Sequence, residues 1–156
     1  LILTQLDRIE RTTGTHHKKW HKVRHKNRMQ YIRTVLQRRI AAGRVFIVHY
    51  RKPIPFFFPM VTILEKSIRA IAHERYRANV YVDGIDNYKA MQLTNALRAS
   101  GISLRLVQSR RDESEALIRL ADMWAGCARS ALLKQGDARE LLEQAKLQGY
   151  LRDLTA

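Results

Sequence analysis

The segment ANVYVDGIDNYKAMQLTNALRASGISLRLVQS, residues 78–109, decides the fold class predicted for this chain. Residues 78–84 and 102–109 have the apolar, β-branched composition of strands, and the stretch between them has the pattern of a helix. Asp86 stands where a helix N-cap is expected, and Gly101 stands where the helix should stop. A strand, a helix and a second strand in this order predict an α/β fold with at least partly parallel pairing.

Patterns on either side of this segment extend the α/β prediction. One further strand is expected at residues 44–50, and residues 52–59 form an irregular segment because prolines cannot donate to a ladder. Ser114 is expected to cap one helix, and Asp137 with Glu140 is expected to form a capping box for another. Further helices are expected at residues 1–14, 27–43, 60–76, 114–133 and 138–148.

Length and composition limit the protein class. A chain of 156 residues with 46% hydrophobic and 28% charged residues is most simply one domain with a real core. The longest apolar stretch, PIPFFFPMVTIL at residues 53–64, contains three prolines and is too short to span a bilayer. The single cysteine, Cys127, allows no internal disulfide, and no signal peptide is visible, so we expect a cytoplasmic protein without membrane contact.

The positive charge is concentrated in the first half of the chain. The protein has 29 Lys and Arg against 14 Asp and Glu, and no acid occurs between Arg11 and Leu64. A long stretch of one sign gathers polyanions, so we expect nucleic acid as a partner; the alternative is a merely solvated basic surface. The residues expected to contact nucleic acid are Lys18, Lys19, Trp20, Lys22, Arg24, Lys26 and Arg28.

Two acids stand at positions that suit a site. Asp83 ends the strand at residues 78–84, and sites in open α/β sheets form at the carboxyl ends of strands, although a turn residue is the alternative. Asp122 lies in an otherwise apolar helix, where a carboxylate costs several kcal/mol unless it is paired or bound to metal. An ion pair with Arg119 is the alternative there. Gly126 and nearby alanines would let this helix approach the sheet and bring Asp122 towards Asp83.

Two such carboxylates favour a hard divalent metal. Mg²⁺ and Mn²⁺ take oxygen ligands, and in so basic a chain the substrate that suits them is a phosphodiester. Asp83 and Asp122 are therefore the predicted metal ligands, and Glu113 is a third predicted catalytic acid, or else a first-turn acid favoured by the helix dipole. His17, His21 and His25 have a spacing seen in zinc sites, but the surrounding lysines and arginines favour a surface that faces a polyanion.

Three stretches resemble one family. They are KKWHKVRHKNRMQYI at residues 18–32, NVYVDG at 79–84 and RLVQSRRDESEALIRLADMWAG at 105–126. Together they resemble the bacterial domain of unknown function 3800 family, which is placed with the ribonuclease H-like fold. Asp83 matches the strand-end Asp of that family, Asp122 matches its Leu-Ala-Asp helix, and Lys19-Trp20 resembles a Lys-Trp pair of many members. An opening Asp-Glu strand is absent here, and Arg119 replaces the usual Gln.

The resemblance implies a ribonuclease H-like three-layer fold with a mixed sheet flanked by helices. It implies a single domain over residues 1–156, incomplete at its N-terminus, with a C-terminal helix at 137–156 appended. The implied activity is metal-dependent cleavage of DNA or RNA. Two alternatives stay open: a non-catalytic nucleic-acid-binding module in which Arg119 neutralises Asp122, and a subunit of a larger assembly. We also expect an upstream hairpin with an Asp-Glu pair, and a second copy or partner chain that completes the sheet.

Overall fold

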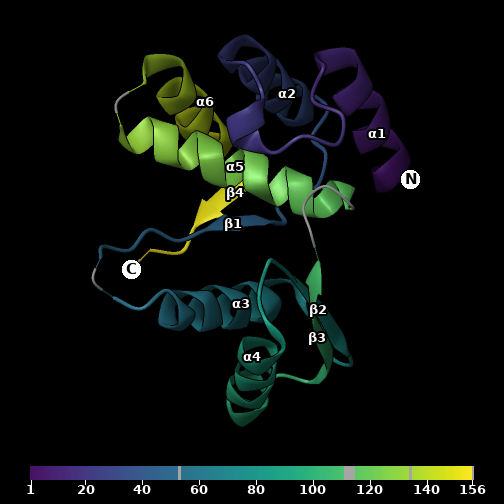
Figure 1. Cartoon of the computed structure of the whole chain (residues 1–156), viewed down its shortest axis with the longest axis vertical. Helices are drawn as coiled ribbons and strands as arrows, with labels where there is room; N and C mark the ends of the chain where they lie inside the picture. The colour runs from purple at the N-terminus through teal and green to yellow at the C-terminus, as the bar shows by residue number, and fades with distance from the viewer. Residues whose placement is uncertain (53, 111–114, 134, 156) are drawn as a thin grey trace. The chain divides into compact units, whose positions relative to one another are not determined.

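The computed structural model describes residues 1–52, 54–110, 115–133 and 135–155, and within these ranges the chain is a mixed α/β protein (Figure 1). The α/β class predicted from residues 78–109 is thereby confirmed. The chain divides into two compact units. The first comprises Leu1–Val45 and Arg111–Arg152, and the second comprises Phe46–Arg110 and Asp153–Ala156.

The first unit is helical. Its helix α5 packs against α1, α2, α6 and the short 3₁₀ helix η1, so that four segments from both ends of the chain share one core (Figure 1). The core-facing residues of α5 include Leu120, Met123, Trp124 and Cys127, whose spacing puts them on one face of the helix. The bounds are α1 Ile2–Thr13, η1 Trp20–Lys22, α2 His25–Gln37, α5 Ala116–Leu132 and α6 Gly136–Leu147.

Helix α5, predicted from sequence as an otherwise apolar helix, is buried on one face only. Leu117, Ala121 and Ala125 are exposed, and Asp122 is half-buried at the border between the two faces. These apolar residues are exposed because the neighbouring helices cover only the opposite face of α5. A carboxylate at this border keeps part of its hydration, so burial alone does not require a metal there.

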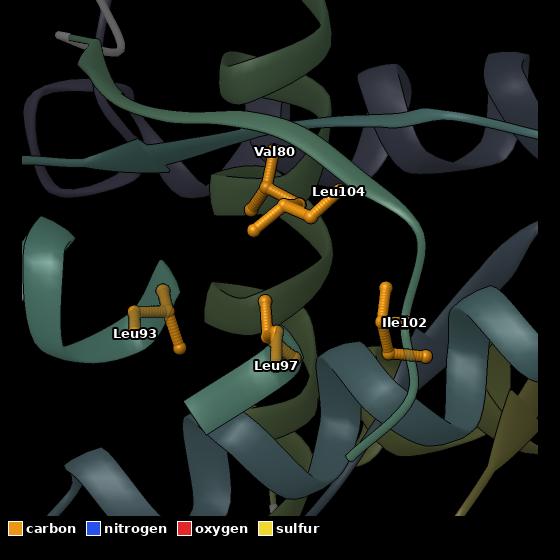
Figure 2. Packing of buried hydrophobic residues seen from close by; sticks show 5 residues of the cluster. All are labelled: Val80, Leu93, Leu97, Ile102 and Leu104. Carbon is orange, nitrogen blue, oxygen red and sulfur yellow. The ribbon is translucent and has the colours of Figure 1, made fainter. Parts of the chain in front are cut away.

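The second unit contains the predicted strand–helix–strand segment. Strand β2 (Ala78–Asp83) pairs in parallel with β3 (Leu104–Arg110), and α4 (Asn87–Ala99) connects them. Asp86 caps α4 as predicted, since its Oδ1 accepts a hydrogen bond of 2.7 Å from the amide of Lys89. Helix α3 (Phe57–Ile71) packs against α4. Figure 2 shows the buried cluster between strands and α4, formed by Val80, Leu93, Leu97, Ile102 and Leu104.

A second small sheet was not expected in full. Strand β1 (Val45–Ile47) was predicted within residues 44–50, but its partner β4 (Leu151–Asp153) was not. The boundary between the two units passes through both strands. Beyond the ladder, the amide of Leu154 donates to the carbonyl of Ile47 at 2.8 Å. Three residues carry too little periodicity to be predicted as a strand from sequence.

Helix ends differ from the prediction in several places. Helix α2 stops at Gln37 instead of near Gly43, because Arg39 and Ala41 adopt positive φ angles of 51° and 60° and turn the chain. Helix α3 begins at Phe57, ahead of the expected residue 60.

Helix α6 begins at Gly136, so Asp137 lies in its first turn and the predicted capping box is wrong. The predicted cap Ser114 lies outside the described residues.

Among the helices in the described ranges, none combines the length and apolar character that crossing a membrane requires.

Candidate nucleic-acid interface and acidic positions

The basic segment between α1 and α2 presents its charges to solvent. Lys18, Lys22, Arg24 and Lys26 are exposed, and Val23 anchors the segment because its side chain is buried. We call these four cations the loop cations. Arg33 on α2 and Arg38 and Arg39 just after it are exposed as well. No acid interrupts this series in the sequence.

Trp20 holds the basic segment on α5. Its ring lies against Gly126 so closely that a Cβ atom at that glycine would be 2.2 Å from Cδ2 of the ring. Its amide donates a hydrogen bond of 2.8 Å to Oδ2 of Asp122. Its carbonyl accepts one of 2.7 Å from Nε of Arg28, whose guanidinium lies 4.8 Å from the ring centroid. We call Trp20, Arg28, Asp122 and Gly126 the tryptophan seat.

The tryptophan seat gives a structural role to three predicted site residues. Asp122 uses one carboxylate oxygen to fix the first amide of η1, and Gly126, one helical turn later, supplies the flat surface for the ring. Trp20 and Arg28 were expected to contact nucleic acid, but both are half-buried and engaged with each other. The Lys-Trp pair and the Leu-Ala-Asp stretch of the resemblance therefore meet in the first unit.

Arg119 makes its buried ion pair with Glu10 of α1. Nε donates to Oε1 at 2.8 Å and Nη2 donates to Oε2 at 3.1 Å, a bidentate arrangement. The side chains are only 6% and 1% exposed. Glu10 therefore faces the core of the first unit, although it is an acid of the first helix. Burial, and secondarily the Glu10 carboxylate, raises the pKa of the neighbouring phenol of Tyr31.

Asp83 is exposed at the carboxyl end of β2, in the position predicted from sequence. Its register partner at the end of β3 is Arg110, and the amide of Gly84 donates to the Arg110 carbonyl at 3.2 Å. The guanidinium of Arg110 lies 5.3 Å from the ring of Tyr81. This strand end therefore combines a carboxylate and a guanidinium.

Two predictions about acids stay predictions. Asp83 belongs to the second unit and Asp122 to the first, so the geometry within each unit does not test whether their carboxylates converge. Glu113 lies outside the described residues, as does its neighbour Asp112.

The predicted histidine series does not share one helix. His21 lies in η1, and His25 is the first residue of α2 and is hydrogen-bonded through Nε2 to Asp137 of α6. That hydrogen bond is the main reason why the pKa of the Asp137 carboxyl is below its usual value. His16, which no sequence pattern singled out, bonds instead to Asp7.

A hollow of about 340 Å³ adds to the basic surface of the first unit. It opens beside the turn after α2, and the positive φ angles of Arg39 and Ala41 shape that turn. Its lining includes the three arginines Arg38, Arg39 and Arg44 and no acid. These arginines add three positive charges to this side of the unit.

Comparison with known proteins gives no match: no protein-family model, no curated protein and no solved structure matches this chain.

Proposed function

We propose that this protein binds nucleic acid through its helical unit, with the loop cations and the exposed Arg33, Arg38 and Arg39 as the contact surface. The observation that carries the proposal is the tryptophan seat, which fixes an acid-free basic segment on α5. A merely solvated basic tail needs no such support. The three-arginine hollow beside the end of α2 offers a further phosphate contact on the same unit.

Preorganisation explains why a fixed loop favours binding. Ordering a rotamer-rich side chain at an interface costs about 0.5–1.5 kcal/mol, and ordering its backbone adds to that cost. Because Trp20 and Val23 already hold the backbone, the loop cations meet a phosphate chain with less entropy to lose. In this proposal Trp20 and Arg28 support the loop, and half-buried Lys19 lies at its edge.

The proposal is tested by removing charge from two places. One variant replaces Lys18, Lys22, Arg24 and Lys26 with Gln; the control replaces Arg51, Lys52, Arg75 and Arg77, which are exposed residues of the second unit. Both variants lose four positive charges. We expect fluorescence anisotropy with a labelled duplex to show much weaker binding for the loop variant than for the control. Equal losses would mean that net charge, and not this surface, governs binding.

A second candidate function is cleavage of phosphodiesters with Mg²⁺ or Mn²⁺. The observation that favours it is Asp83, an exposed carboxylate at the end of a parallel strand pair, the place where α/β sheets hold ligands. A ribonuclease H-like arrangement is supported by the parallel order β2–α4–β3 and by the sequence resemblance. In this candidate Asp83 and Asp122 are the metal ligands and Glu113 is a further catalytic acid.

Cleavage assays separate the two candidates. The chain is incubated with single-stranded, duplex and hybrid substrates, with Mg²⁺, with Mn²⁺ and with chelator. Metal-dependent cleavage that Asp83→Asn abolishes would support the nuclease, whereas binding that chelator leaves intact and that yields no products supports the binding module. Absence of nucleic-acid binding at low salt would favour the third possibility, a subunit that contacts an acidic protein.

A further inference from the structure

Three potential metal ligands meet where α1 gives way to the basic segment. They are Asp7 of α1 and the consecutive residues His16 and His17. Their ligand atoms all lie within 4.8 Å of one another, and Nε2 of His16 is 3.0 Å from Oδ1 of Asp7. The two imidazole rings meet edge to face with centroids 3.8 Å apart. This grouping is distinct from the predicted metal ligands Asp83 and Asp122.

A rigid turn produces the grouping. Gly14 ends α1 with a φ of 70°, and the amide of Thr15 donates to the carbonyl of Glu10 at 2.9 Å, which reverses the chain. The hydroxyls of Thr13 and Thr15 are buried and lie 3.0 Å apart. The chain therefore runs back along α1. In this way His16 reaches Asp7, which lies about two helical turns before the end of α1.

The backbone of His17 is held in an unfavourable conformation. Its φ of 57° lies in the left-handed region, where a residue with a Cβ is uncommon. Such conformations persist only where the surroundings enforce them, and they concentrate at ligand sites. Here the conformation keeps the second imidazole beside the first.

The carboxylate of Asp7 is prepared to act as a ligand. Arg11 donates from Nε to Oδ2 at 2.9 Å. Because Arg11 binds Oδ2, Oδ1 of Asp7 is oriented towards His16. Outer partners of metal-binding carboxylates orient the ligand oxygen in the same way.

We propose that Asp7, His16 and His17 form a binding site for a divalent metal of the zinc type, with water completing the coordination. Two imidazole nitrogens and one carboxylate oxygen suit zinc and its neighbours better than magnesium or calcium. At zinc–ligand distances of about 2.1 Å, two ligand atoms lie roughly 3.4 Å apart, which small ring rotations of these half-buried and exposed side chains reach.

Binding would have a defined consequence for the proposed interface. The site immediately precedes Lys18, the first of the loop cations. A bound metal would join α1 to the start of the basic segment, a few residues before Trp20 of the tryptophan seat. The inference concerns a separate site and does not depend on either proposed function.

The test uses the full chain and two metal probes. Zn²⁺ is titrated by isothermal calorimetry near pH 7.5, and Co²⁺ is followed by its visible absorption, which reports coordination number and donor type. The variants are Asp7→Asn, His16→Gln and His17→Asn; Asn tolerates the left-handed backbone, so the last change removes a ligand without adding strain. The matched control is His21→Gln, which removes an exposed histidine of the same basic segment.

We expect one Zn²⁺ per chain, and at least about tenfold weaker binding in each ligand variant, since even outer-shell changes cost that much. The His21→Gln control should bind like the unmodified chain. Absence of saturable binding, or equal affinity in all variants, would overturn the proposal. Loss of binding in His21→Gln together with retention in His16→Gln would also overturn it and would assign the metal to the other histidines.

Discussion

Gly126 is the residue on which the basic segment rests, because the ring of Trp20 occupies the space of a side chain there. In Gly126→Ala the new methyl group would overlap the ring, and overpacking of this kind costs about 1–3 kcal/mol. We expect urea unfolding to show a loss of that size. Gly136→Ala is the control, since a Cβ at Gly136 meets no atom within 4 Å, and it should change stability by less than about 0.5 kcal/mol. Equal losses of stability in the two variants would contradict the packing of the Trp20 ring on Gly126.

Glu10 and Arg119 should behave as a unit. Removing one partner of a buried pair leaves an uncompensated charge, so Glu10→Met or Arg119→Met alone should destabilise the fold by about 3–5 kcal/mol. The double variant should recover most of that loss, because two apolar side chains of similar volume leave no buried charge. A double-mutant cycle in urea checks this. Additive losses would show that the two side chains do not depend on each other.

At the scale of elements, Asp122 couples η1 to α5. Asp122→Ala removes an acid, so on charge alone the variant should bind nucleic acid more tightly. We expect weaker binding instead, because the amide of Trp20 loses its acceptor and the loop cations lose their fixed positions. Anisotropy titrations at constant salt measure the direction of the change. Tighter binding would show that net charge matters and that the seat does not.

The packing of α5 against its neighbours also predicts a pH dependence. Burial raises the pKa of the Cys127 thiol to about 12 and that of the Tyr150 phenol to about 12. Both groups bind their protons more tightly in the folded chain than in the unfolded chain. Their contribution to the free energy of unfolding is therefore complete below about pH 9 and is lost as pH rises towards 12.

Urea unfolding midpoints between pH 8 and 11 should therefore fall with rising pH. In Cys127→Ala the fall should be shallower, because one of the buried titrating groups is gone. A midpoint that stays constant over this range would contradict the burial of both side chains.

Local signals explain which elements were predictable. The segment β2–α4–β3 follows from its own residues: an Asp86 cap, a glycine stop and two apolar runs. The end of α2 did not follow, because its position depends on distant partners. The carbonyl of Ile40 accepts from the hydroxyl of Tyr150, and the amide of Gly43 donates to the Tyr150 carbonyl at 2.9 Å. Strand β4 likewise depends on a distant partner, because it pairs with β1.

The sequence predicted the charges of the candidate interface but not the contacts that hold the basic segment in place. A run of cations without acids predicts a polyanion surface, and Lys18, Lys22, Arg24 and Lys26 are indeed exposed. No pattern indicated that Trp20 would contact Gly126, over a hundred residues later in the chain. Asp122 was singled out correctly as unusual, but its amide partner was visible only in the fold.

At the scale of the whole molecule, the chain combines a basic helical unit with a small βαβ unit. Within the described residues, β2 and β3 form a two-stranded sheet, which α4 covers through the cluster of Val80, Leu93, Leu97, Ile102 and Leu104. That a second copy or a partner chain extends this sheet stays a prediction. The nucleic-acid binding that we propose belongs to the helical unit, with its exposed loop cations and its fixed loop.

The most direct measurement of that claim is the salt dependence of binding. The affinity of the chain for a duplex is measured from about 50 to 200 mM salt, where each neutralised phosphate contributes about 0.9 to the slope of log affinity against log salt. For the Gln variant of Lys18, Lys22, Arg24 and Lys26 we predict a slope lower by up to about 3.6, and no such change for the second-unit control. An unchanged slope in the loop variant would contradict the account.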